Sequence, residues 1–134
     1  MEKLDTTSFE NALNSLKVVI EVYNSDKQNL ITRDSMIQRF EYTYSLALKM
    51  IKRFFSQGAF VEDIEGMTFN EMVRQANKMN LLKSNLEKWN DFRLMRNLTS
   101  HTYDEKVALD VVKIIPEFCD DAEFLLNKLK ERLS

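Results

Sequence analysis

The sequence predicts an all-α protein, an antiparallel up-and-down helical bundle of four to five helices. The chain has only two Gly and one Pro in 134 residues, whereas sheets and loop-rich folds need more residues that favour turns. Its apolar residues recur at intervals of three and four, which is the period of a helix with one buried face. Two capping boxes, in residues 68–71 and 84–87, mark the starts of helices.

The first two predicted helices are long and amphipathic. The first covers about residues 8 to 24, and the second about residues 34 to 57. Each carries one apolar stripe, formed by Phe9, Leu13, Leu16, Ile20 and Tyr23 in the first and by Phe40, Tyr44, Leu48, Ile51 and Phe55 in the second. Stripes of this width predict that each helix buries one face in a shared core.

Three further helices are predicted in the second half of the chain. Residues 68–71, Thr-Phe-Asn-Glu, open a short third helix. Residues 84–87, Ser-Asn-Leu-Glu, open a fourth helix with Ser84 as its cap, and this helix reaches towards His101. Asp104 is suited to cap the last helix. The last helix has a near-heptad apolar seam, Val107, Val111, Ile114, Phe118, Ala122, Leu125, Leu129 and Leu133. Pro116 lies inside it and should kink it.

Composition indicates one globular domain covering residues 1–134. Hydrophobic residues make up 44% of the chain and charged residues 30%, as in globular domains of this length. The net charge of −2 is unlike that of proteins that coat nucleic acid. Cys119 is the single cysteine, which excludes an intramolecular disulfide and fits a reducing compartment. Because no apolar run reaches the length of a membrane span, we expect a cytoplasmic protein without membrane contact.

Several common kinds of site are missing from the sequence. There is no glycine-rich phosphate loop. One His and one Cys cannot build an ordinary zinc site. Helical bundles that bind metal use a Glu three residues before a His, but no Asp or Glu stands three residues before His101. We therefore expect no metal and no cofactor.

The most informative stretch is residues 96–103, Arg-Asn-Leu-Thr-Ser-His-Thr-Tyr. Arg96 follows Phe92 by four residues and Trp89 by seven, so the three share one helical stripe. A guanidinium on an aromatic stripe must be paired or must face a cleft or interface. His101 lies five residues on, about 140° around a regular helix. A helix that loosens before His101 would swing the imidazole towards Arg96, and Tyr103 returns to the face of Arg96 if the helix persists.

These residue types suit metal-free cleavage of RNA. Histidine transfers protons near neutral pH, and the fork of an arginine matches phosphate oxygens. Arg96 would hold the developing charge while His101 moves a proton, and Asn97 would orient His101 or the phosphate. The spacing alone is also consistent with a structural reading, in which His101 caps the end of the helix and Arg96 forms an ion pair.

The same stretch resembles a family signature. Arg96, Asn97 and His101 fit the R-x4-H motif of the HEPN superfamily, and Tyr103 extends it to the R-x4-H-x-Y of the HepT branch, also known as the nucleotidyltransferase substrate-binding protein family. Residues 33–44, RDSMIQRFEYTY, are similar to the family segment R-D-x-x-I-Q-R-F-E-x-T-Y. The resemblance runs from about residue 8 to residue 130. Ser45 and Leu48 stand where the family often has Glu and Trp, at expected packing or interface positions.

The resemblance implies a helical bundle that forms a homodimer, with an interface cleft lined by Arg96, Asn97 and His101 of both subunits. It implies a metal-independent endoribonuclease toxin of a toxin–antitoxin pair, with RNA and not DNA as its substrate. It also implies a partner antitoxin, a minimal nucleotidyltransferase, which silences the toxin by transferring AMP to Tyr103. Two alternatives remain open: a non-catalytic substrate-binding subunit of a two-component nucleotidyltransferase, and a purely structural dimeric bundle.

Overall fold

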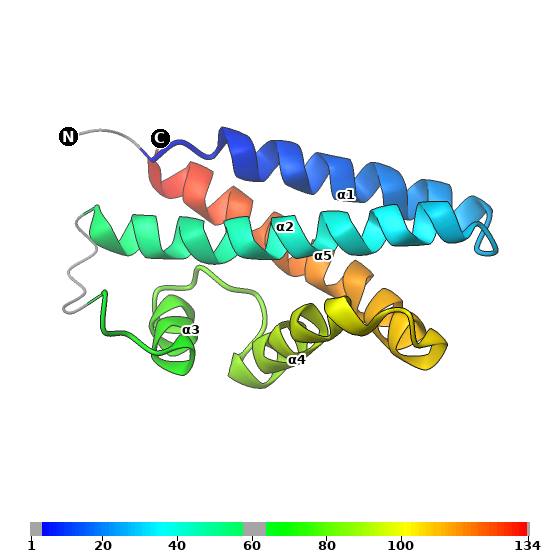
Figure 1. Cartoon of the computed structure of the whole chain (residues 1–134). Helices are drawn as coiled ribbons and strands as arrows, with labels where there is room; N and C mark the ends of the chain where they lie inside the picture. The colour runs from blue at the N-terminus through cyan, green and yellow to red at the C-terminus, as the bar shows by residue number, and fades with distance from the viewer. Residues whose placement is uncertain (1–3, 58–63, 134) are drawn as a thin grey trace.

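The fold is all-helical, as predicted. The computed structural model describes residues 4–57 and 64–133, and over these ranges it contains five α-helices and no strand. The helices are α1 (Thr7–Ser25), α2 (Leu30–Ser56), α3 (Phe69–Lys78), α4 (Leu86–Leu98) and α5 (Glu105–Leu133). A short 3₁₀ turn, Thr99–His101, follows α4 (Figure 1).

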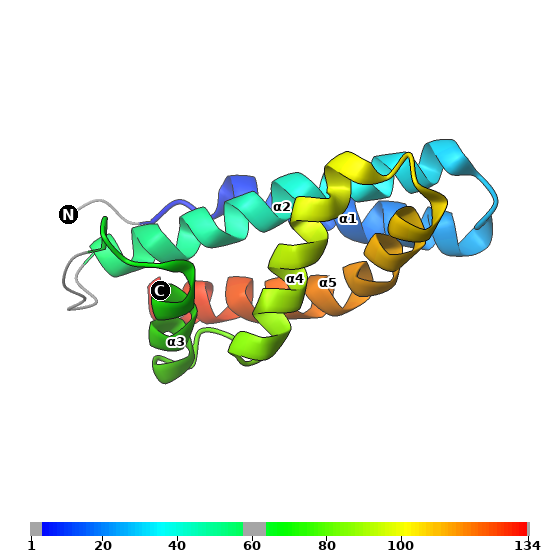
Figure 2. The same cartoon turned by 60° about the horizontal axis from the view of Figure 1, so that its bottom comes forward.

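The three long helices form the body of the molecule. α1 and α2 run antiparallel, side by side, and α5 packs against both of them (Figures 1 and 2). The beginning of α1 lies beside the end of α5, where Lys130 forms an ion pair with Glu10. The short helices α3 and α4 pack on each other and on α2, and α4 crosses α5 (Figure 2). The face between α2, α3 and α4 is where the candidate site lies.

Helix α2 begins earlier than the sequence predicted. The side chain of Asn29 accepts a hydrogen bond from the backbone N–H of Thr32 at 3.1 Å, so the helix starts at Leu30 and not near Asp34. The apolar stripe did not reveal this first turn because Leu30 and Ile31 are 55% and 83% exposed. A polar cap, and not burial, therefore fixes this end of α2.

The caps of the other helices are mostly as predicted. Thr68 accepts from the N–H of Glu71 at 3.1 Å, and Asp104 caps α5 as expected. The cap of α4 is Asn85, however, and not Ser84. Both the backbone N–H and the hydroxyl of Ser84 donate to the buried carboxylate of Asp121 on α5, at 2.9 and 2.8 Å. This long-range partner takes Ser84 out of the capping position.

A cluster of aromatic rings joins α2, α4 and α5. The Phe118 ring makes T-shaped contacts with Phe40 and Phe92, with ring centroids 5.1 and 5.4 Å apart. Trp89 packs edge-on against Phe92 at 5.1 Å, and Tyr44 lies 6.5 Å from Trp89. Four of these rings are fully buried and Tyr44 is 5% exposed. The cluster therefore packs beneath Tyr44, which is the only one of the five rings with any exposure.

The seam of α5 faces the core. Val111, Phe118, Ala122, Leu125 and Leu129 are buried, Val107 and Ile114 are partly buried, and the side chain of Leu133 lies outside the described residues. Pro116 lies inside α5, which continues on both sides of it. Within the described ranges, no helix is both long enough and apolar enough to cross a bilayer.

Candidate active site

The residues that follow α4 form a tight, exposed turn. The helix ends at Leu98, and the 3₁₀ turn Thr99–His101 continues it for one turn. The hydroxyl of Thr99 donates to the carbonyl of Arg96 at 2.7 Å, and the N–H of Asp104 donates to the carbonyl of His101 at 3.1 Å. These bonds confirm the loosening that the weak helix formers before His101 predicted.

The turn presents His101 and Tyr103 together to solvent. His101 is exposed and the side chain of Tyr103 is 85% exposed. Nδ1 of His101 lies 3.4 Å from the hydroxyl oxygen of Tyr103, and the two rings meet edge to face with centroids 6.0 Å apart. An imidazole in this setting can exchange protons with solvent or with a bound ligand.

An ion pair fixes the segment after this turn. Arg33 lies at the beginning of α2 and is 6% exposed. Its guanidinium donates two hydrogen bonds to the carboxylate of Glu105, at 2.7 and 3.1 Å. Glu105 is the first residue of α5 and stands four residues after His101. The pair therefore holds the beginning of α5, and the exposed turn before it, against α2.

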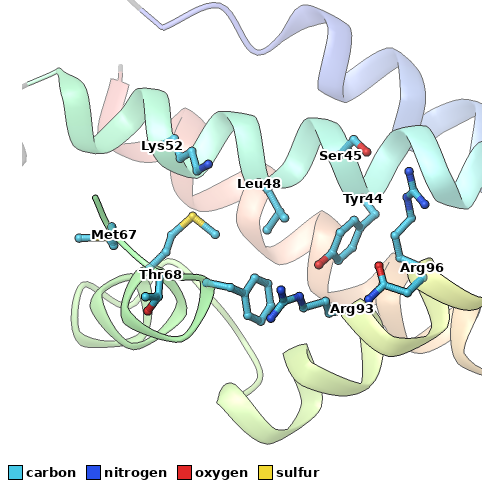
Figure 3. Close-up of a pocket in the computed structure, with 11 residues that line it drawn as sticks. Tyr44, Ser45, Leu48, Lys52, Met67, Thr68, Arg93 and Arg96 are labelled. Carbon is cyan, nitrogen blue, oxygen red and sulfur yellow. The ribbon is translucent and has the colours of Figure 1, made fainter. Parts of the chain in front are cut away.

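Arg96 lies on the last turn of α4 and faces a cavity. The cavity has a volume of about 370 Å³ and opens between α2, α3 and α4. Arg96 and Asn97 line it from α4, and Tyr44 and Lys52 line it from α2 (Figure 3). No carboxylate of the described residues lies within ion-pair distance of Arg96. Its guanidinium is thus available to an anionic ligand.

The cavity is cationic, which the sequence analysis did not predict. Besides Arg96 it is lined by Lys52 and Arg93, and no Asp or Glu is among the described residues that line it. The guanidinium carbon of Arg93 lies 4.8 Å from the centre of the Phe69 ring, a cation–π contact between α4 and α3. Arg93 precedes Arg96 by three residues, so helical spacing puts both on one face. Only folding brings Lys52 and Phe69 beside them.

Tyr44 remains a hydroxyl donor in this cavity. Burial raises the pKa of Tyr44 to about 12, against the opposing effect of the nearby charges of Arg93 and Arg96. The phenol therefore stays protonated at neutral pH. It can donate a hydrogen bond to an anion that the two guanidinium groups hold.

The structure groups the predicted residues into two sets. Arg96 and Asn97 line the cavity, whereas His101 and Tyr103 are not among its lining residues. The expected return of Tyr103 to the face of Arg96 was conditional on a continuous helix. Because α4 ends at Leu98, Tyr103 contacts His101 instead.

This arrangement is suited to binding a phosphate beside a proton-transfer group. The cavity supplies fixed positive charge, and the adjacent turn supplies an exposed imidazole, a side chain that can take or give a proton. Among residues 4–57 and 64–133, no group of three or more His, Cys, Asp or Glu side chains is placed to hold a metal ion.

Comparisons with known proteins place the chain in a family. A family model described as nucleotidyltransferase substrate binding protein like matches residues 4–131. The chain is 36% identical over 140 residues to a probable ribonuclease HepT of Haemophilus influenzae, covering 98% of this chain and 95% of that protein.

Two solved structures share the fold. One is a Haemophilus influenzae protein described as having the fold of a substrate binding domain of a nucleotidyltransferase. It has a TM-score of 0.85 and 33% identity, covering 94% of this chain and 99% of that one. The other, from Thermus thermophilus, has a TM-score of 0.73 and 28% identity, covering 90% and 98%. The family match spans nearly the whole chain, and the chain therefore belongs to the nucleotidyltransferase substrate-binding protein family, in which it resembles HepT.

Proposed function

We propose that the chain is a HEPN-type endoribonuclease, the toxin of a toxin–antitoxin pair, and that it cuts RNA without a metal ion. The observation that carries the proposal is the placement, on successive turns, of an exposed His101 and an Arg96 that has no ion-pair partner among the described residues. The relative named as a probable ribonuclease HepT supports the same activity. Such a toxin would act in the cytoplasm, where its RNA substrate is.

In this mechanism the ribose 2′-oxygen attacks the adjacent phosphorus. The bond from phosphorus to the 5′-oxygen of the next nucleotide breaks, and a 2′,3′-cyclic phosphate forms. Arg96 holds the phosphate oxygens as their charge rises. His101 makes one of the two proton transfers, taking the proton of the 2′-hydroxyl or giving one to the leaving 5′-oxygen, and water makes the other. Asn97, next to Arg96 on the cavity wall, supports the phosphate or the imidazole.

The proposal includes a homodimer and an antitoxin. In the dimer, Arg96, Asn97 and His101 of both subunits line one cleft. The antitoxin is a minimal nucleotidyltransferase that transfers AMP from ATP to Tyr103. The phenolic oxygen attacks the α-phosphorus, pyrophosphate leaves, and the phenolic proton passes to solvent. Because this oxygen lies 3.4 Å from Nδ1 of His101, the new phosphate would sit against the imidazole and repel RNA.

The test is cleavage of a labelled single-stranded RNA by the purified chain in EDTA. We expect a product with a cyclic phosphate, and a rate that falls by about 10²–10⁴ in His101→Ala. Ser100→Ala, which alters a neighbouring exposed position of the same turn, is the control and should keep its activity. Equal cleavage by wild type and His101→Ala would refute the role of His101. After co-expression with the antitoxin, mass spectrometry should find one adenylyl group on Tyr103.

The second candidate is a non-catalytic subunit that binds the substrate of a nucleotidyltransferase. The family description and the Haemophilus influenzae fold neighbour favour it. In that case the chain alone would leave RNA intact and would not slow growth. When the nucleotidyltransferase is added, it would transfer a nucleotide to a third molecule and not to Tyr103.

A further inference from the structure

The cationic cavity extends well beyond the residues that the proposed cleavage uses. Lys52 and Arg93 have no part in the mechanism above, yet both line the cavity that Arg96 borders. In the described part of the chain neither of them has a carboxylate within ion-pair distance. Lys52, Arg93 and Arg96 therefore bring three positive charges to one cavity with no ion-pair partner among the described residues, and a bound anion would relieve their repulsion.

The protein scaffold adds to the positive potential and orders one of the cations. Thr68 and Phe69, the cap and the first residue of α3, line the cavity, so the positive end of this helix borders it. The Phe69 ring lies under the guanidinium of Arg93 at 4.8 Å, which limits its freedom before any ligand arrives. A prearranged cation loses less entropy on binding than a free one.

The cavity also has an apolar wall. Leu48 and Met72 line it beside Phe69, and Met72 is 3% exposed. Its volume of about 370 Å³ is in the range of small-ligand pockets. An anionic part and a flat apolar part within one ligand match a nucleotide, which combines a phosphate with a base. A base can enter only if it is unstacked, which favours single-stranded RNA.

We propose that this cavity binds one nucleotide of a single-stranded RNA, next to the phosphate that Arg96 holds. The phosphate of this nucleotide lies at Lys52, Arg93 and the N-terminus of α3. Its base packs against Leu48, Phe69 and Met72. The cavity thereby positions the strand beside Arg96, an inference that rests on the proposed ribonuclease activity.

The experiment measures the binding of a fluorescently labelled single-stranded RNA by anisotropy, in a His101→Ala background that leaves the RNA uncut. We expect Arg93→Gln and Lys52→Gln each to raise Kd about tenfold, with a shallower salt dependence. Met67→Trp, which narrows the cavity without changing the charge, should weaken binding as well. Lys113→Gln on α5 removes the same charge at an exposed position away from the cavity and should leave Kd unchanged.

The outcomes separate this inference from the proposed function. If the three cavity variants bind RNA as well as the control Lys113→Gln does, while circular dichroism shows them folded, the cavity is not an RNA site. If Arg93→Gln and Lys52→Gln lose the binding of free AMP but keep that of RNA, the ligand is a free nucleotide, and the inference fails. If the cavity variants lose RNA binding as expected but the chain with intact His101 does not cut RNA, the nucleotide site stands and the ribonuclease proposal fails.

Discussion

At the scale of single residues, the chain exposes its one imidazole and buries its one thiol. Cys119 is 7% exposed on α5, beside Phe118 of the aromatic cluster. Burial raises the pKa of this thiol to about 11. The thiolate is the reactive form, and near pH 8 it would amount to only about a thousandth of the molecules. Cys119 therefore behaves as a small core residue and not as a nucleophile.

We predict that the native protein reacts with a thiol reagent at least about a hundredfold more slowly than the protein unfolded in urea. Absorbance of the released thiolate measures both rates. Asn90→Cys, which places a second thiol at an exposed position of α4, provides the comparison within the folded chain. Fast labelling of Cys119 in the native state would show that this part of α5 opens to solvent.

At the scale of helices, the bond between Arg33 and Glu105 links the beginnings of α2 and α5. The hydrogen bonds from Arg33 hold the pKa of Glu105 below its ordinary value of 4.5. The same bonds raise the pKa of Arg33. A carboxyl whose pKa is lower in the folded state adds stability above its unfolded pKa. It loses that stability as the pH falls through the folded pKa.

We therefore predict that Glu105→Gln is less stable than wild type at neutral pH and that the difference shrinks as the pH falls below 4.5. Urea unfolding, followed by the fluorescence of the single tryptophan Trp89, measures the free energy of unfolding at each pH. Glu21→Gln, on the exposed face of α1, is the matched control. A deficit of Glu105→Gln that is independent of pH would mean that the ionised pair does not hold α5.

The helices could be predicted from the sequence because each is set by local signals. Apolar spacing located the buried faces, and Thr68 and Asp104 were identified as caps from short patterns. The early start of α2 was missed although its cap, Asn29, is local, and the other error occurred where a tertiary contact decides. Ser84 is diverted from its cap by Asp121, 37 positions further along the chain, and no local pattern contains that information.

The site divides in the same way. Arg96, Asn97, His101 and Tyr103 stand within eight residues, so one motif could indicate them all. Lys52 and Phe69 belong to α2 and α3 and reach the cavity only through packing. The contact between His101 and Tyr103 depends on the end of α4 at Leu98. A boundary shift of one or two residues would turn Tyr103 elsewhere, and boundaries are the weakest part of a sequence prediction.

At the scale of the whole molecule, the separation of Arg96 from His101 is an argument for a second copy of the chain. Within one protomer Arg96 lines the cavity and His101 does not. We propose a two-fold dimer in which the exposed turn of each copy lies beside the cavity of the other. One catalytic centre would then combine Arg96 of one subunit with His101 of its partner.

This arrangement predicts complementation between two inactive variants. Arg96→Ala and His101→Ala should each form dimers by analytical ultracentrifugation, and each alone should cut RNA poorly. After co-expression about half of the dimers are mixed, and one of the two centres in each mixed dimer has both residues intact. Cleavage should therefore recover to about a quarter of the wild-type rate. If mixed dimers form but stay inactive, Arg96 and His101 must act from the same chain, and the turn would have to move towards the cavity when RNA binds.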